Sequence, residues 1–90
     1  MTEESKISVI IPCLNEETNL KVLLPYLIQQ GGEFLSEIIV SDGGSKDKTI
    51  AIAESFGVSV VDCPLRNRAS QLNMGGRCAK GDILYFLHAD

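Results

Sequence analysis

The stretch that decides the fold is Ile38-Ile39-Val40-Ser41-Asp42-Gly43-Gly44-Ser45-Lys46-Asp47. A short apolar run stops at a carboxylate, two glycines follow, and then come side chains that cap helices. This order is typical of a buried parallel strand that leads into a helix. Because ligands of open α/β sheets bind at the carboxyl ends of the strands, Asp42 is a candidate site residue. The alternative is that Asp42 only caps the turn or the next helix, as aspartate often does.

Composition narrows the class of protein. The 90 residues are 44% hydrophobic, which indicates one small globular domain or part of a larger one. The net charge is -4 and the eight Lys and Arg residues are scattered, so we expect no nucleic-acid partner. No apolar run approaches the roughly twenty residues of a membrane span, and the polar start is unlike a signal peptide. We therefore expect a cytoplasmic location and no membrane span in this segment.

The cysteines predict neither a disulfide framework nor a zinc site. Cys13, Cys63 and Cys78 are odd in number, far apart and without a CxxC pair. We interpret all three as small buried hydrophobic residues.

The first half of the chain predicts two strands with a helix between them. The β-branched run at residues 7–11 predicts a strand that Pro12 ends. Asn15 is a candidate N-cap for a helix that Pro25 kinks or breaks and that Gly31-Gly32 ends. The apolar face of this helix consists of Leu20, Leu23, Leu24, Leu27 and Ile28. A second strand is predicted over residues 37–41.

The second half repeats the pattern. Ser45 or Asp47 is expected to cap a helix that ends at Gly57, and a third strand covers residues 58–61. The apolar side of this helix is predicted to comprise Ile50, Ala53 and Phe56. A helix over residues 67–79 should approach the sheet closely through a face of small residues, namely Ala69, Leu72, Gly76 and Ala79, and a fourth, buried strand follows at residues 82–87.

Strands alternating with helices predict the α/β class with right-handed crossovers. We expect a Rossmann-like three-layer α/β/α arrangement with a mainly parallel sheet in the order 3-2-1-4. The loop after the first strand contains no glycine, which disfavours a dinucleotide-binding domain, and a Walker loop is absent as well.

Polar groups at three strand ends suggest a shared cleft. In the order 3-2-1-4 the first and fourth strands are neighbours, so the residues that follow the first, second and fourth strands should converge: Asn15 and Glu16, then Asp42, then His88 and Asp90. Carboxylates without a basic cradle suggest Mg²⁺ or Mn²⁺ that brings in a diphosphate. Arg66 or Arg68 could add phosphate contacts. The alternatives are that Glu16 only complements the helix dipole, that His88 is structural, and that the arginines form a solvated face.

Together these motifs resemble the N-terminal half of a family 2 glycosyltransferase of the GT-A fold. The resemblance covers nearly all of the chain. It is carried by Ser8-Val9-Ile10-Ile11-Pro12 with Asn15-Glu16, by residues 37–45 with Asp47 and Thr49, by Asn73 with Gly75, by Ala79-Lys80-Gly81-Asp82, and by Phe86-Leu87-His88-Ala89-Asp90.

The resemblance implies a nucleotide-diphosphosugar donor and an inverting transfer to an unknown acceptor. It implies that Pro12, Asn15 and Glu16 line the nucleoside pocket and that Asp42 recognises the base. Arg68 and His88 would lie near the nucleotide, and Asp90 would hold the divalent metal. The general base is expected beyond Asp90. Residues 1–90 would then be the nucleotide-sugar-binding N-terminal part of a truncated GT-A domain, inactive on its own.

Two positions depart from the commoner family pattern. Gly43 stands where a second acid is usual, and His88 stands at the first acid of the Asp-x-Asp motif. Both changes remove negative charge, so metal affinity and the ribose contact could differ. The combination of Asp-Gly-Gly-Ser with Phe-Leu-His-Ala-Asp is similar to a bacterial branch of arsenosugar-associated glycosyltransferases.

Two other functions remain open from the sequence. A nucleotidyltransferase of related fold would need a glycine- and arginine-rich loop with a lysine after the first strand, which residues 13–19 do not supply. A non-catalytic nucleotide-binding module is the second alternative. An unpaired edge on the fourth strand also predicts self-association of the chain.

Overall fold

Four parallel strands form one sheet in the order β3-β2-β1-β4 in the computed structural model, which describes residues 6–63 and 67–89. Helices connect the strands along the chain. The elements are β1 (Ile7–Cys13), α1 (Glu17–Gly31), the short 3₁₀ helix η1 (Gly32–Phe34), β2 (Leu35–Asp42), α2 (Thr49–Ser55), β3 (Ser59–Asp62), α3 (Arg68–Cys78) and β4 (Ile83–Phe86). The predicted α/β class and strand order are confirmed.

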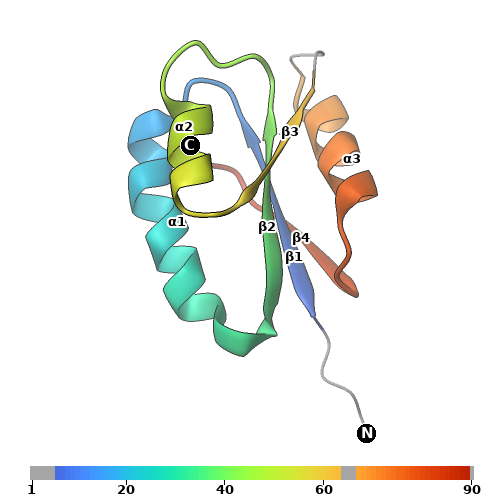
Figure 1. Ribbon diagram of the computed structural model, residues 1–90. Coiled ribbons are helices and arrows are strands. Elements are labelled where there is room, and N and C mark those ends of the chain that lie inside the picture. Colours follow the sequence, from blue (N-terminus) through green and yellow to red (C-terminus); the bar gives the residue numbers. More distant parts are fainter. Residues whose placement is uncertain (1–5, 64–66, 90) are drawn as a thin grey trace, which may run out of the picture.

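The helices form two layers around the sheet (Figure 1). α1 and α2 cover one face and α3 covers the other. The alternation of side chains along β1 explains this division, because successive residues of a strand point to opposite faces. Val9 and Ile11 belong to the core with Leu20 and Leu24 of α1, whereas Ile10 faces Gly75 of α3. The predicted three-layer arrangement is therefore confirmed.

The prediction that Pro12 ends the first strand is wrong, because β1 continues to Cys13. The Ile10 carbonyl accepts a hydrogen bond from the Leu87 N–H, and the Cys13 carbonyl accepts one from the Gly43 N–H. Even-numbered residues of β1 therefore bond towards β4 and odd-numbered ones towards β2. The backbone nitrogen of Pro12 is therefore on the β4 side of β1, beyond Ile10, which pairs with Phe86 as the last residue pair of these two strands. The missing N–H of Pro12 consequently removes no bond of the ladder.

α1 runs without interruption through Pro25, so the proline does not break it. Leu20 and Leu24 are fully buried against the sheet, as the predicted apolar face requires. Ile28 is wrongly placed in that face, because 43% of its surface is exposed. Gly32 follows the helix with a positive φ of 54°, a conformation that glycine adopts without strain.

The buried face of α2 also differs from the prediction. Thr49, Ile52 and Ala53 are buried, whereas Phe56 lies outside the helix with 38% of its surface exposed. Thr49, the first residue of this short helix, is buried, and its hydroxyl oxygen accepts a hydrogen bond from the Glu16 N–H. Gly57, with φ of 75°, ends the segment as expected.

The face of α3 that contacts the sheet lies one residue before the predicted one, so Gln71 and Gly75 are buried in place of Leu72 and Gly76. Ala69 is exposed. A Cβ atom at position 75 would lie 2.4 Å from Cγ2 of Ile10, so glycine is required where this helix crosses β1. At Gly76 the nearest atoms to such a Cβ would be 3.8 Å away, which is an ordinary contact.

The fourth strand is not buried as predicted, because each of its residues is between 42% and 53% exposed. β4 pairs with β1 along one edge, and among the described residues it has no second neighbour in the sheet. Cys78 is likewise exposed, whereas Cys13 and Cys63 are buried as expected. Within residues 6–63 and 67–89, no helix has the length and apolar character needed to cross a membrane.

Gly75→Ala is expected to lower the free energy of unfolding by about 1–3 kcal/mol, because the added methyl group overlaps Ile10. Gly76→Ala is the matched control one residue away. It should leave stability unchanged or raise it by up to about 1 kcal/mol through helix propensity. Urea unfolding of both variants measures the difference. Equal effects of the two substitutions would contradict the close approach of α3 to β1.

Candidate functional site

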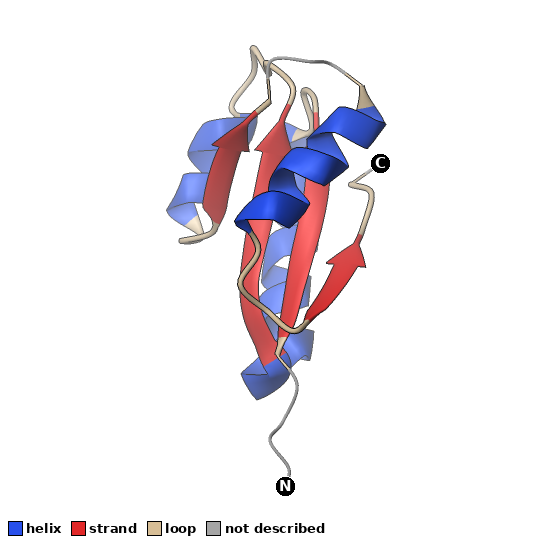
Figure 2. Ribbon diagram, turned by 90° about the vertical axis from the view of Figure 1, so that its right-hand side faces the viewer, coloured by secondary structure: helices blue, strands red, loops and turns tan. Residues whose placement is uncertain are grey.

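β1, β2 and β3 end side by side at one edge of the sheet. Cys13 pairs with Asp42, and Asp42 pairs with Asp62 on the other side. The Gly43 N–H donates to the Cys13 carbonyl at 2.9 Å, and the Cys63 N–H donates to the Asp42 carbonyl at 2.8 Å. The segments that follow the three strands therefore leave the sheet at the same edge, where ligands of open α/β folds bind. Figure 2 shows these carboxyl ends together with the first turn of α3.

The Asp42 carboxylate organises the loop that follows it. Asp42 is fully buried, and its Oδ2 accepts hydrogen bonds from the backbone N–H groups of Gly44, at 2.9 Å, and Ser45, at 2.8 Å. Its Oδ1 accepts a third, from the Ser45 hydroxyl at 2.5 Å. Gly44 has a φ of 101°, which turns the loop back over the carboxylate. The turn-capping role considered for Asp42 is therefore present in the structure.

Asn15 links the loop after β1 to the loop after β2. Its backbone N–H donates to the Ser45 hydroxyl oxygen at 2.8 Å, and its Oδ1 accepts hydrogen bonds from the N–H groups of Lys46, at 2.7 Å, and Asp47, at 3.4 Å. Asn15 adopts a positive φ of 56°, a conformation that asparagine tolerates better than most residues. The prediction that Asn15 caps α1 is wrong, because its side chain serves the neighbouring loop and Glu16 precedes the helix.

The start of α1 is capped by side chains from the α2 segment. The Glu16 N–H donates to the Thr49 hydroxyl oxygen at 2.8 Å, and the Glu17 N–H donates to Oδ2 of Asp47 at 3.2 Å. In return, Oε1 of Glu17 accepts from the Lys48 N–H at 3.1 Å. These contacts satisfy N–H groups that the first turn of a helix leaves without partners. The N-cap position of α2 is Lys48 and not Ser45 or Asp47 as predicted, although Asp47, one residue earlier, accepts a hydrogen bond from the Thr49 N–H at 2.9 Å.

α3 meets the same edge from the opposite face. Asn67 is its N-cap, and the Asn67 side chain accepts from the Ser70 N–H at 2.8 Å. The buried Gln71 donates from Nε2 to the carbonyls of Cys13 and Ser41, both at 2.9 Å. Arg68 is an exposed residue one turn before Gln71. Through Gln71, α3 thus bridges the backbone carbonyls at the carboxyl ends of β1 and β2.

The structure brings some of the predicted site residues together. Asn15, Glu16 and Asp42 belong to one set of hydrogen-bonded loops. Pro12 is buried and pairs with Ser41. His88 is exposed and lies two residues beyond the end of β4. The candidate residues Arg66 and Asp90 lie outside the described residues, so their predicted roles are not tested by the coordinates.

Electrostatics at this edge keep the Cys13 thiol neutral. Burial, followed by the negative charges of Glu16, Asp42 and Asp47, raises the pKa of Cys13 to about 12. A protonated thiol at neutral pH agrees with the interpretation of Cys13 as a small buried hydrophobic residue. In the part of the chain that the structure describes, no three His, Cys, Asp or Glu side chains are grouped to hold a metal ion.

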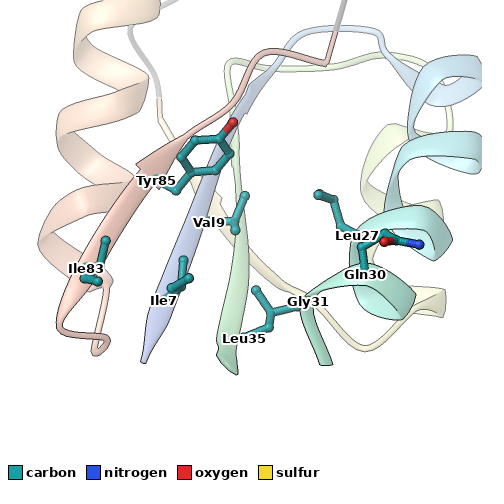
Figure 3. Close-up of a pocket in the computed structure, with 8 residues that line it drawn as sticks. All are labelled: Ile7, Val9, Leu27, Gln30, Gly31, Leu35, Ile83 and Tyr85. Atoms are coloured by element: carbon teal, nitrogen blue, oxygen red, sulfur yellow. The ribbon is translucent and has the colours of Figure 1, made fainter. Parts of the chain in front are cut away.

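An apolar hollow lies at the opposite end of the sheet from these loops. Ile7, Leu35 and Ile83, which begin β1, β2 and β4, contribute to its wall together with Leu27 of α1 and Tyr85 (Figure 3). Its volume is about 320 Å³. The wall is almost wholly apolar, so this hollow does not suit a charged ligand such as a diphosphate.

Ser45, Thr49 and Gln71 were not among the predicted site residues. The sequence indicates only a capping role for Ser45 and a place in a family motif for Thr49, whereas in the structure the Ser45 hydroxyl accepts from the Asn15 N–H and the Thr49 hydroxyl accepts from the Glu16 N–H. The spacing of Gln71 and Gly75, four residues apart, places both on one helix face. That spacing could have indicated a polar residue facing the sheet.

Asp47→Asn is expected to make stability less sensitive to acid. The hydrogen bond from the Thr49 hydroxyl is the main cause that holds the pKa of Asp47 below its ordinary value. Below about pH 4 the unfolded chain therefore binds a proton that the folded chain does not, and this part of the stability is lost as pH falls. Urea unfolding between pH 3 and 7 should show that the advantage of the wild type over the variant shrinks in acid.

Thr49→Val removes the same hydrogen bond from the other side and should flatten the acid dependence in the same way. Stability curves for the wild type and Asp47→Asn that stay parallel down to pH 3 would contradict this account.

Comparison with known proteins identifies the family. The family model described as Glycosyl transferase family 2 matches residues 8–90. The chain is 40% identical over 93 residues to the uncharacterized glycosyltransferase YfnE of Bacillus subtilis (strain 168), a match that covers 94% of this chain and 23% of that protein. It is 37% identical over 91 residues to 4,4'-diaponeurosporenoate glycosyltransferase of Staphylococcus haemolyticus (strain JCSC1435), covering 93% of this chain and 24% of that protein.

Solved structures agree with this assignment. Glucosyl-3-phosphoglycerate synthase from Mycobacterium tuberculosis, crystallised with Mn²⁺, UDP-glucose and glycerol 3-phosphate, superposes with a TM-score of 0.84 at 30% identity, covering 96% of this chain and 34% of that one. The same enzyme crystallised with Mg²⁺ and UDP gives a TM-score of 0.82. The chain thus spans about a quarter of the length of the curated relatives and a third of the solved one. On the match over residues 8–90, the chain belongs to glycosyl transferase family 2.

Proposed function

We propose that this chain is the donor-binding part of a metal-dependent, inverting glycosyltransferase that takes a sugar from a nucleotide diphosphosugar. The observation that carries the proposal is the joining of the loops after β1 and β2 by Asn15, Asp42 and Ser45 at the carboxyl edge of the sheet. A site of this kind is preformed and placed where α/β folds bind nucleotides. Support comes from the similar synthase that was crystallised with UDP-glucose and Mn²⁺.

In this proposal the nucleoside lies against the loop after β1. Pro12, Asn15 and Glu16 line it, as the family resemblance implies. Oε1 of Glu16 accepts a hydrogen bond from Nδ2 of Asn19 at 2.8 Å, which fixes the direction of this half-buried carboxylate. Asp42 recognises the base through the loop that it shapes, because its own carboxylate is buried and accepts bonds from Gly44 and Ser45.

The diphosphate and its cation are assigned to the residues after β4 and at the start of α3. Arg68 is a cation at the first turn of α3, and His88 follows β4 at the same edge. Mg²⁺ and Mn²⁺ commonly use one or two carboxylates and complete their coordination with substrate phosphates and water. Asp90 together with a diphosphate fits this donor set, so a preformed group of three protein ligands is not needed. When bound, the cation would neutralise charge on the leaving diphosphate.

The proposal limits what the chain does alone. An inverting transfer needs a base to take the proton of the acceptor hydroxyl. The family resemblance places that base beyond Asp90, so we propose that residues 1–90 bind the donor without transferring its sugar. The acceptor is not assigned.

The wild-type chain is expected to bind UDP in the presence of Mn²⁺, measured by isothermal titration calorimetry, and removal of the cation with EDTA should weaken binding. Asp42→Asn should reduce the affinity about tenfold, because an amide nitrogen cannot accept the bonds that hold the loop. Asp62→Asn is the matched control, since it makes the same change in charge at the exposed neighbour paired with Asp42.

Titration of the same protein with ADP, GDP and CDP would identify the preferred base. If none of the four nucleoside diphosphates binds, the proposal is wrong. Transfer of sugar by residues 1–90 alone would contradict the proposal that the chain only binds the donor.

A further inference from the structure

Gln71 is a polar residue on the buried face of α3. Only 6% of its surface is exposed, and both N–H groups of its carboxamide are used, one towards the Cys13 carbonyl and one towards the Ser41 carbonyl. Those carbonyls belong to two different strands, close to Asn15 in the loop after β1 and to Asp42 at the end of β2. A single side chain therefore bridges the two strand ends, in addition to the backbone hydrogen bond from the Gly43 N–H to the Cys13 carbonyl.

Gly43 lies directly against this carboxamide. A Cβ atom at position 43 would be 3.2 Å from Cδ and Nε2 of Gln71 and 3.4 Å from its Oε1. The carboxamide cannot move away easily, because it is held at 2.9 Å by two carbonyls. Gly43 is not among the residues with positive φ, in contrast to Gly44 beside it. A side chain at position 43 would therefore require the Gln71 carboxamide to shift by a few tenths of an ångström, whereas the backbone conformation of Gly43 does not itself require glycine.

We infer that Gln71 is a positioning residue for the donor site, and that its carboxamide restricts residue 43 to glycine. The inference rests on the proposed function, because it concerns the loops assigned to the nucleotide. It gives a physical reason for the first departure from the commoner family pattern. A second acid beside Asp42 would have to displace the carboxamide, so a single carboxylate, that of Asp42, shapes the loop at the end of β2.

A double-mutant cycle tests this coupling. The proteins are the wild type, Gly43→Ala, Gln71→Ala and the double variant, and each is measured for urea unfolding and for UDP affinity with Mn²⁺ under conditions where it is folded. In the wild-type background Gly43→Ala should weaken UDP binding about fivefold and lower the urea midpoint, as expected for neighbours in one hydrogen-bond network. In the Gln71→Ala background it should change neither quantity, because the three atoms in its way are gone.

Gln71→Ala by itself should weaken UDP binding, whereas Gln29→Ala, which removes an exposed glutamine on α1, should not. If Gln71→Ala does not fold, Gln71→Asn replaces it, because its carboxamide is one methylene short of the two carbonyls. Leu24→Ala supplies a variant that is destabilised on the other face of the sheet and should keep its affinity for UDP once folded.

Additive effects of the two substitutions on the urea midpoint would overturn the restriction of residue 43 by Gln71. Unchanged UDP affinity in folded Gln71→Ala, with a wild type that binds, would overturn the positioning role. A wild type that does not bind UDP or any other nucleoside diphosphate would reject the proposed function, and the unfolding cycle would still decide whether Gln71 and Gly43 are coupled.

Discussion

The hydrogen bonds that join the Asp42 loop to the Asn15 loop are the interaction on which the rest of this edge depends. The Ser45 hydroxyl donates to Asp42 and accepts from the Asn15 N–H, so one side chain connects two segments thirty residues apart in sequence. The two loops cannot shift independently while these hydrogen bonds to the buried Asp42 are kept. A buried carboxylate is costly unless it is hydrogen-bonded, and here three donors offset that cost.

The same loops also hold the starts of α1 and α2 next to each other. The N–H groups of Glu16 and Glu17 donate to Thr49 and Asp47, and the Lys48 N–H donates to Glu17 in return. The helices lie on the same face of the sheet and share one apolar core with β1 and β2. On the other face, Gln71 and Gly75 bring α3 close to the strand ends. Packing on both faces therefore determines where the loops of the site lie.

Most of the fold could be predicted from the sequence, because strands and helices are separated by clear turn residues. The apolar run at residues 38–40 and the glycines after Asp42 mark β2, one of the two inner strands of the sheet. The helix faces could not be predicted as well. Periodicity assigned Phe56 to the core and overlooked Gln71, because a hydrophobicity pattern does not reveal which polar side chain meets strand carbonyls. β4 was predicted as buried because it is apolar, although burial depends on neighbours that a strand's own composition does not specify.

At the site, the sequence indicated which segments converge but not how they are bonded. Asn15 was predicted to cap its own helix, yet its side chain accepts from a loop far away in sequence. Local capping rules could not anticipate this, since the partner exists only after the sheet has formed.

The central claim is that the carboxyl edge of the sheet, and not the apolar hollow beside β4, binds the nucleotide. The most direct test is a titration of the ¹⁵N-labelled chain with UDP and Mg²⁺, followed by backbone amide NMR. The account predicts saturable shifts of the amide signals of residues 14–17 and 43–49, with little change at Leu27, Ile83 and Tyr85. Shifts confined to those three residues, or no shifts at the loop residues at saturating UDP, would contradict it.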